Sequence, residues 1–534
     1  MKKRIQVNQL GYMTGMPKNA VCRVTAGVFY LVEAATGISV YAGRLTCPFF
    51  DRESGDNVRL ADFSDFNTCG SYFIRAGYRR SDVFEISAEP YRNIRRTVLD
   101  GIFTNRCGCD LSAYGERCGS YAHKECHTDP VMRNGIAADV SGGWHTGGRY
   151  EKDLRSACLT VADMIYSVKL FGENFSANER ENITDECRWG LEWILRMQDR
   201  DGGVYGGISG GDGETVTPEE DGGEYSFKPQ SCSAALIFTA AAALGSVFFE
   251  KTDKAFSRKL RQAAELSWIA ALRTDEYENY CRRLGSTSEN GDELNAIESE
   301  FMWAMCEMYA LTGEKSFEQM INEKYMLSSF HGFGYSACGG FAALSYLMNS
   351  RTHDRTAEAF IRKRLTDRAD RMLIAVNSSG YRTARSADGG YTYGSNFAVL
   401  SDCMDFIAAY LISGEQKYLE GAFDQLGYIF GKNPMGVSYV TGCGNESCRM
   451  PFHVMSMAMD NDAPVRGMAV SGANYERSDE YSKWHIEKGT PAAKCYADCE
   501  CSTSTNEPSV HFSAPIIFAS AFFDRVGKGA LTGI

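Results

Sequence analysis

Short runs of β-branched and aromatic residues, separated by turn residues, occupy the first 88 positions of the chain. The expected strands are residues 20–25, 28–32, 38–45, 71–75 and 82–86. Many short strands divided by turn signals are typical of two packed antiparallel sheets. The pattern therefore predicts a small β-sandwich at the N-terminal end of the chain.

From residue 91 onward, apolar positions recur at helical spacing. The expected helices are residues 91–103, 154–171, 185–198, 231–250, 256–272, 296–311, 339–348, 356–376, 397–412 and 417–430. In the stretch 397–412, one apolar stripe is formed by Phe397, Leu400, Met404, Ile407 and Leu411. Such a stripe indicates a helix with one face against a core.

A short internal sequence repeat occurs at the ends of two of these helices. The sequence MYALTGE at 308–314 resembles AYLISGE at 409–415. In each copy a helix is expected to end at a glycine, which tolerates left-handed geometry, and another helix follows. Repeated helix pairs form either a closed barrel or an open solenoid.

Length and composition limit the class of protein. A chain of 534 residues suits one large domain and one small domain, which we place at 89–534 and 1–88. Hydrophobic content of 44% and charged content of 23% are those of a soluble globular protein. The net charge of −12 gives no electrostatic basis for binding nucleic acid or an anionic membrane, whereas a neutral saccharide is compatible with it.

The N-terminal sequence and the number of cysteines indicate a reducing environment. The N-terminal MKKRIQVN has basic residues with no apolar segment behind them, so we expect no signal peptide and a cytoplasmic location. The apolar run 234–249 is short for a membrane span. A disulfide framework is typical of small secreted domains, so most of the 19 cysteines are expected to be reduced thiols, in a cytoplasm or in the surroundings of an anaerobe, and a few could be metal ligands.

Two motifs far apart in the chain carry the functional signal. The first is STSTNE at 502–507, which by itself could simply begin a helix. The second is DVSGGWHTGGRY at 139–150. Together they resemble the two halves of the active site of glycoside hydrolase family 9, the inverting β-glucanases. Further matching stretches lie at 106–108, 122–127, 201–205, 218–221, 393–396, 431–434, 467–468 and 472–474.

This resemblance implies a fold and a bacterial-type protein. The expected fold is mainly α: a closed (α/α)6 barrel preceded by an immunoglobulin-like β-sandwich. Residues 7–12 resemble the first strand of that sandwich. In the family, the glutamate that matches Glu507 is the general acid. The upstream loop normally reads W-x-D-A-G-D, and its aspartates position and activate water.

Here the loop departs from the family. Alignment through Trp144 places Thr146 and Arg149 at the two aspartate positions. Neither side chain can accept a proton from water at neutral pH. Other acids that could supply a base are Asp139, Glu151, Asp153 and Glu446. The substrate loop also differs, since P-H-H-R in the family is P-F-H-V at 451–454 here, and the tyrosine common before S-T-N-E is Thr503.

Three functions remain open. The protein could hydrolyse a different β-linked oligosaccharide or polysaccharide, with Arg149 binding an anionic group such as a uronate carboxylate. It could be an inactive relative that binds glycan, or it could carry out phosphorolysis, for which an anionic nucleophile needs no base. Candidate sugar contacts are Trp144, Tyr205, Tyr393, Phe452 and His453. Core packing is the alternative role for each aromatic residue, and a satisfied loop histidine is the alternative for His453.

A metal site is also expected. Two thiolates and two imidazoles can fill a tetrahedral structural zinc site, and Cys107, Cys126, His127 and His145 offer them. The spacing is not that of a zinc finger, but the family resemblance implies a structural zinc at matching positions. His123 is expected to be exposed. The acids Asp201, Glu219, Glu220 and Asp221 could serve calcium or form a solvated acidic loop. The sequence gives no indication of the oligomeric state.

Overall fold

The computed structural model describes residues 4–211, 213–283, 292–325, 330, 332–387, 390–459 and 461–527. The chain divides into two compact units. The first comprises residues 1–102, 369–410 and 414–533, and the second comprises residues 103–368, 411–413 and 534. Because the first unit joins the N-terminal strands to C-terminal helices, the predicted domain boundary at residue 88 stays a prediction.

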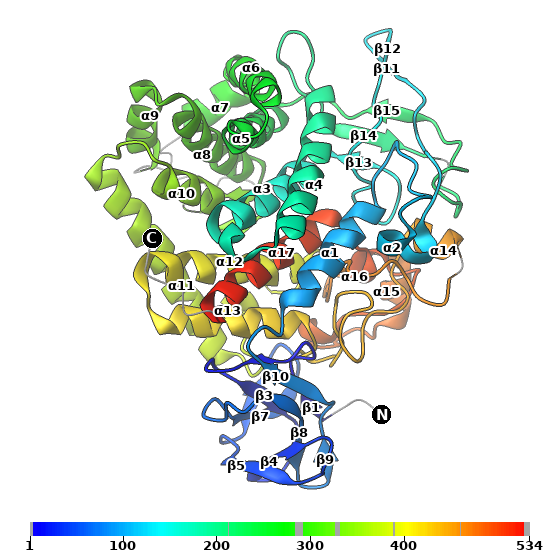
Figure 1. Ribbon diagram of the computed structural model, residues 1–534, viewed down its shortest axis with the longest axis vertical. Helices are drawn as coiled ribbons and strands as arrows, with labels where there is room; N and C mark the ends of the chain where they lie inside the picture. Colours follow the sequence, from blue (N-terminus) through cyan, green and yellow to red (C-terminus); the bar gives the residue numbers. More distant parts are fainter. Residues whose placement is uncertain are drawn as a thin grey trace. The chain divides into compact units, whose positions relative to one another are not determined.

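The first unit begins with a β-sandwich, drawn in blue in Figure 1. One sheet has the strand order β1-β3-β7-β6, and the other has the order β2-β10-β8-β4-β5, with β9 paired to β8. Apolar side chains from both sheets, such as Cys22, Phe29 and Ile74, form one buried core. The strands are β1 Ile5–Gln6, β2 Tyr12–Met13, β3 Asn19–Cys22, β4 Val28–Glu33, β5 Ser39–Arg44, β6 Phe49–Asp51, β7 Asp56–Asp62, β8 Gly70–Ala76, β9 Arg79–Arg80 and β10 Phe84–Ser87.

The expectation of one strand over residues 7–12 is wrong. β1 pairs with β3 and β2 pairs with β10, so the chain passes from one sheet to the other between them. Gly11 lies in this crossing at φ +108°, a conformation that favours glycine, and an added Cβ would meet the carbonyl oxygen of Glu85. The backbone between β1 and β2 forms hydrogen bonds with residues outside the two sheets. For example, Gln9 N donates to Phe430 O at 2.8 Å.

The first unit contains most of the second copy of the predicted helix-pair pattern, at residues 409–415, whereas the first copy, at 308–314, lies at the end of α8 Asp292–Thr312 in the second unit. α12 ends before Gly414, which adopts φ +71° at its C-cap, and α13 begins two residues later. The longer helices are α1 Arg92–Thr104, α11 Arg355–Ser378, α12 Ser395–Ser413, α13 Gln416–Ile429 and α17 Val510–Gly527, with shorter turns at α14 Val454–Ala458, α15 Glu480–His485, η4 Ala492–Lys494 and α16 Thr503–Asn506. α1, α11 and α12 continue into the second unit.

The second unit is built from helices with a few short strands. α5 is an apolar helix that packs against α3, α6 and α8, and 83% of it is buried inside the protein, as expected of a core helix. The elements are α2 Gly115–Cys118, η1 Gly119–Tyr121, β11 Val131–Arg133, β12 Ile136–Ala138, β13 Lys152–Asp153, α3 Leu154–Phe171, η2 Gly172–Asn174, α4 Ala177–Arg196, β14 Gly207–Gly210, β15 Tyr225–Phe227, α5 Cys232–Phe249, α6 Lys254–Ala271, α7 Asp275–Arg283, α8 Asp292–Thr312, α9 Lys315–Tyr325, β16 Phe333–Gly334, β17 Ala337–Cys338 and α10 Gly339–Met348.

Local capping sets several of these boundaries. The Asp153 side chain accepts a hydrogen bond from Ser156 N and begins α3 at the predicted residue. α4 begins eight residues earlier than predicted, at Ala177, because Ser176 and Glu179 form a capping box. The short helices α7 and α9 were not predicted from the apolar pattern. The mainly α class with an N-terminal β-sandwich is confirmed.

A buried ionic network joins the sandwich to the helices within the first unit. Lys432 Nζ and Arg382 Nε each contact the Asp424 carboxylate. Asn19 of β3 donates to Asp424 Oδ1 at 3.0 Å and accepts from Lys432 Nζ at 2.7 Å. Burial raises the pKa of Asp424, but the two cations outweigh this effect, and the net pKa lies below its usual value.

We expect Asp424→Asn to lower the free energy of unfolding by about 3 kcal/mol near neutral pH, because it leaves Lys432 buried without its counter-charge. A carboxyl whose pKa is depressed by folding stabilises the protein above its unfolded pKa, about 3.9, and loses that effect as pH falls. The difference between the two proteins should therefore shrink below about pH 4 in urea titrations. Glu420→Gln, at an exposed site on the same helix, is the control. An equal loss in both variants would contradict the prediction.

Candidate functional site

Backbone pairing in the second unit brings two of the four predicted metal ligands together. Cys107 N donates to Gly143 O and His145 N donates to Asn105 O, both at 2.9 Å, so residues 105–107 run antiparallel to 143–145. The residues that precede these two ligands, Arg106 and Trp144, both donate hydrogen bonds to one residue of α4. Buried Glu186 accepts from Arg106 Nε at 3.0 Å and from Trp144 Nε1 at 2.7 Å. Because Arg106 lies opposite Trp144, the pairing places Cys107 and His145 diagonally on the same face.

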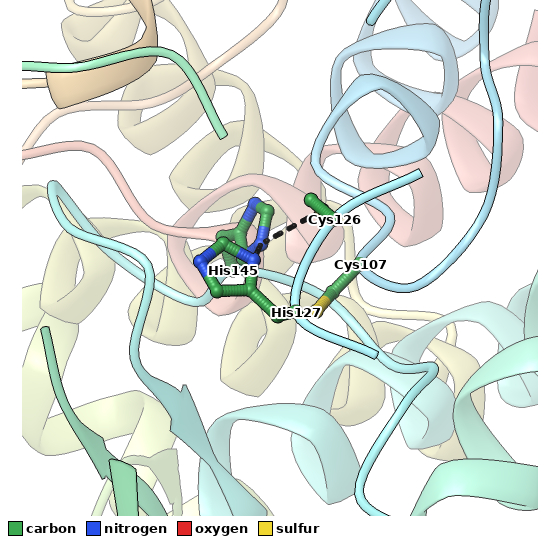
Figure 2. Close-up of side chains that lie close together, drawn as sticks. All are labelled: Cys107, Cys126, His127 and His145. Carbon is green, nitrogen blue, oxygen red and sulfur yellow. Dashed lines mark hydrogen bonds between the residues drawn. The ribbon is translucent and has the colours of Figure 1, made fainter. Parts of the chain in front are cut away.

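The four predicted ligands form one cluster. One possible ligand atom from each of Cys107, Cys126, His127 and His145 lies within 4.8 Å of the others, and Figure 2 shows the side chains converging. His145 Nε2 lies 3.3 Å from His127 Nδ1 and 3.8 Å from Cys126 Sγ. The sulfurs and imidazole nitrogens suit a tetrahedral site for a soft or borderline metal ion. The cluster could therefore hold a metal.

Polar neighbours complete the cluster. His127 adopts φ +50°, uncommon for a residue other than glycine, and its Nε2 lies 3.1 Å from Asp221 Oδ2. A carboxylate on the outer nitrogen orients a metal-binding imidazole. On the other side, the buried Lys152 ammonium donates to Cys107 Sγ at 3.3 Å and to Gly142 O at 3.1 Å. Sequence reasoning missed Glu186 and Lys152 and assigned Asp221 to a calcium site or a solvated loop.

The protonation states of Cys107 and His145 suit metal binding. Burial raises the pKa of Cys107, but hydrogen bonding to Cys126 and the Lys152 charge outweigh it, and the net pKa lies well below the usual value. Burial lowers the pKa of His145 to about 4, so its ring is neutral at pH 7. Thiolate and neutral imidazole are the forms that bind metal ions. By contrast, the hydrogen bond with Cys107 and burial raise the pKa of the Cys126 thiol. Burial lowers the pKa of His127, but its interactions with Cys107 and Asp221 outweigh this effect, and the net pKa is raised.

Two other expectations concern this region. The expectation that His123 is exposed is wrong: it is 2% exposed, and its Nδ1 lies 2.6 Å from Lys124 O. Among the described residues, the Cys/His cluster is the one group of three or more metal-binding side chains. The calcium site expected at Asp201, Glu219, Glu220 and Asp221 stays a prediction. Asp201 accepts from Gly203 N, and Glu220 accepts from the Thr217 hydroxyl.

Glu507 lies at the end of a tightly held segment in the first unit. It follows the short helix α16 and is extended, with φ −77° and ψ +126°, as expected of a residue before proline. Its backbone oxygen accepts from Ser471 N at 2.8 Å. The partly exposed side chain accepts from Tyr393 Oη at 2.7 Å through Oε2. The carboxyl group is thus accessible but fixed in position.

Buried polar groups hold the residues before Glu507. The Asn506 side chain is fully buried, donating to Asp498 Oδ1 at 3.2 Å and accepting from Tyr496 Oη at 2.7 Å. Asp479 accepts from Ser504 N at 2.8 Å. Burial raises the pKa of Asp479, but hydrogen bonds from the Ser504 hydroxyl and from the backbone N–H groups of Ser482 and Ser504 outweigh this effect, so the net pKa is below the usual value. The helix-start interpretation does not describe Glu507, because α17 begins three residues later, at Val510.

The predicted sugar contacts differ in accessibility. Tyr393 is half exposed beside Glu507. Phe452 N donates to Asn506 O at 3.0 Å, and His453 is buried with Nδ1 2.8 Å from Ser456 Oγ. In the second unit, Trp144 is buried against Glu186, and Tyr205 is buried with its hydroxyl 3.1 Å from Asp199 Oδ2. Burial favours packing roles for Trp144 and Tyr205, and the sugar-binding roles of all five residues stay predictions.

The loop positions Thr146 and Arg149 belong to the second unit. Thr146 is buried, and both its N and its Oγ1 donate to Glu151 O, at 3.0 and 3.1 Å. Arg149 is exposed and donates to Gly213 O at 3.2 Å through Nη1. The guanidinium is therefore presented to solvent on a loop held by backbone hydrogen bonds.

Comparisons with known proteins agree along the whole chain. The family model of glycosyl hydrolase family 9 matches residues 91–520, and that of the cellulase N-terminal ig-like domain matches residues 1–81. A cellodextrinase of Butyrivibrio fibrisolvens is 27% identical, covering 97% of this chain and 99% of its own length. Endoglucanase D of Acetivibrio thermocellus is also 27% identical, covering 97% of this chain and 83% of its own.

Solved structures give the same result. A metagenome-derived family 9 endoglucanase superposes with a TM-score of 0.86 at 26% identity, covering 97% of this chain and 98% of that one. A zinc-binding triple mutant of the family 9 endoglucanase J30 has a TM-score of 0.85 at 27% identity, covering 96% and 99%. With the fold, both sequence motifs and the two family models in agreement, the chain belongs to glycosyl hydrolase family 9, with the immunoglobulin-like domain that precedes many of its catalytic domains.

Proposed function

We propose that this protein hydrolyses β-linked oligosaccharides with Glu507 as the general acid. The observation that carries the proposal is the fixed, partly exposed Glu507 carboxyl group beside the half-exposed Tyr393. A general acid must reach the glycosidic oxygen while its position is held by its surroundings. Relatives over nearly the whole chain are named cellodextrinase and endoglucanase. This supports a glucan or a related β-linked sugar as substrate.

The residues at the positions of the family's general base distinguish this chain from the family pattern. Thr146 and Arg149 stand where the resemblance places the aspartates, and losing a general base typically costs about 10²–10⁴-fold in rate. We therefore propose low activity on cellulose chains. The exposed Arg149 guanidinium suits a substrate with a carboxylate, since arginine binds carboxylates through two parallel hydrogen bonds.

Two alternatives follow from the same loop. Without a proton acceptor at positions 146 and 149, the protein could bind glycan without turnover. With inorganic phosphate held by Arg149, it could cleave the bond by phosphorolysis, in which the anion attacks without a base.

We further propose that the Cys/His cluster holds a structural zinc ion. The four protein donors match a closed tetrahedral site with no position left for substrate. The bound ion would join residues 107, 126, 127 and 145, which lie in a region with little regular secondary structure. In this role the metal stabilises the loop that carries Thr146 and Arg149 and takes no part in the reaction.

The test is a panel of neutral, amino and uronic β-linked oligosaccharides, with and without phosphate, analysed by mass spectrometry. We expect cleavage by the unaltered protein and a loss of about 10²-fold or more in Glu507→Gln. Glu500→Gln, an exposed acid seven residues upstream, is the control and should retain activity. Cleavage that survives Glu507→Gln would refute the general-acid role. If no sugar is cleaved but one raises the melting temperature, the protein is a glycan-binding relative.

A further inference from the structure

Two cysteines stand two positions apart in the turn that precedes α16, within the first unit. Ser502 N donates to Cys499 O at 3.0 Å, which closes a β-turn over residues 499–502. Cys499 is partly exposed and Cys501 is exposed. Cys501 N donates to Cys499 Sγ at 3.5 Å, so the first side chain folds back toward the second cysteine. The turn therefore presents both thiols at one accessible place.

The two thiols also contact each other. Partial burial raises the pKa of the Cys501 thiol, and the Cys499 thiol beside it, through its charge and a hydrogen bond, raises this pKa further. Residues two positions apart have Cα atoms at most about 7 Å apart, and less in a turn. A disulfide joins Cα atoms about 4.4–6.8 Å apart. The two cysteines can therefore be joined without movement of other segments toward them.

The carbonyl group of Cys499 belongs to the structure that holds Glu507. Its oxygen accepts from Ser502 N at 3.0 Å and from Asn506 Nδ2 at 3.5 Å. Asn506 precedes Glu507, and Asn506 N donates to Ser502 O at 3.0 Å within α16. The orientation of one carbonyl group in the turn is thus coupled to the backbone just before the Glu507 carboxyl group.

A disulfide bond would reorient this carbonyl group. The sulfurs of a disulfide are about 2.05 Å apart, closer than two thiols in hydrogen-bond contact, so Cys499 and Cys501 would have to approach. The peptide group that carries the Cys499 oxygen lies inside the ring that closes. Upstream, Asp498 is fixed because it accepts from Arg449 N at 2.9 Å. The change is therefore taken up by the turn itself, and the hydrogen bonds to the Cys499 oxygen weaken.

We propose that Cys499 and Cys501 form a reversible disulfide that controls the position of residues 502–507. The co-reactant is a small-molecule disulfide. The exposed Cys501 thiolate attacks one of its sulfurs, which gives a mixed disulfide and releases one thiolate. The Cys499 thiolate then attacks the Cys501 sulfur and releases the second. Two protein thiols are oxidised, the small disulfide is reduced to two thiols, and the two protons pass to the released thiolates.

The exposure of the turn suits a reversible bond, because exposed disulfides are typically labile and regulatory. The effect on catalysis rests on the proposed role of Glu507 as general acid. A general acid that moves by about 1 Å from its productive position can lose about 10²-fold in rate. Oxidation of the turn is therefore expected to lower the activity of the protein, and reduction is expected to restore it.

The test is oxidation of the full chain with oxidised glutathione near pH 8.5, the usual pKa of a thiol. Peptide mass analysis should show that the peptide with both cysteines loses its two thiol hydrogens. Amide hydrogens of residues 502–507 should exchange about 2–10-fold faster, the effect of one lost hydrogen bond. The value of kcat should fall by up to about 10²-fold. Dithiothreitol should reverse all three changes.

Two variants separate this disulfide from other oxidation. Cys501→Ser cannot form it, and under the same conditions should keep the exchange rates and the activity of the reduced protein. Cys47→Ser removes an exposed cysteine near the β-sandwich and should respond as the unaltered protein does.

Two results would overturn the proposal: both thiols stay free, or the disulfide forms and exchange at residues 502–507 does not change. If the disulfide forms and exchange accelerates while kcat stays the same, the effect on catalysis is wrong. If the reduced protein cleaves no sugar, the hydrolase proposal fails, and peptide mass and hydrogen exchange still decide whether the disulfide controls the segment.

Discussion

Removing the metal from the Cys/His cluster is expected to lower the melting temperature of the protein by roughly 10 °C. A structural site contributes its binding free energy to folding. Each kcal/mol lost shifts the midpoint by about 2–4 °C for a domain of about 150–250 residues, close to the size of the second unit, mainly residues 103–368. Without the ion, the Cys107 thiolate remains buried beside Lys152, and two imidazoles and a second sulfur lose their shared partner. The pairing of residues 105–107 with 143–145 and its contacts with Glu186 then remain, without the cross-link that the ion supplied.

Cys107→Ser is the sharper form of this experiment. Elemental analysis should find about one zinc per chain in the unaltered protein and much less in the variant, and calorimetry should show the lower midpoint. Cys118→Ser, a buried cysteine of the same segment outside the cluster, should keep its metal and lose little stability. Metal-free protein that melts at the temperature of the untreated protein would contradict a structural role.

Thr146→Asp combined with Arg149→Asp is expected to raise the rate of β-glucan cleavage by about 10²–10⁴-fold, the usual value of a general base. The change restores both acids of the family loop. The loss of the hydrogen bond from exposed Arg149 to Gly213 O costs little stability. The loss of the bond from the buried Thr146 hydroxyl to Glu151 O costs more, so the melting temperature of the variant is measured as well. The measurement is release of reducing ends from cello-oligosaccharides, with product configuration followed by NMR.

The control separates the added carboxylate from the lost arginine. Arg149→Ala alone should not increase cleavage of neutral glucans, and it should weaken binding of any uronate-containing sugar. If the double variant retains its fold and remains as slow as the original protein, the alignment of Thr146 and Arg149 with the family's aspartates does not describe the reacting positions.

Much of the fold follows from local sequence. The ends of α3 and α10 are those predicted, because an apolar pattern and its boundary residues lie within one or two turns of each other. The glycine ends of α8 and α12 are local as well, since Gly313 and Gly414 both adopt positive φ. The family motifs were equally readable, because each is a short continuous stretch. Residues 7–12 were wrongly predicted because the chain changes sheets there, and pairing partners are distant in sequence.

The sequence by itself determined the class of fold, the family and the four side chains that could bind a metal. Only the tertiary structure decided that Asp221 orients His127 across 94 positions and that Glu186 holds both Arg106 and Trp144. It also decided that His123 is buried and that Glu151 lies beside Thr146. Helix caps and motifs depend on neighbours along the chain, whereas burial and hydrogen-bond partners depend on segments that meet only when the chain is folded.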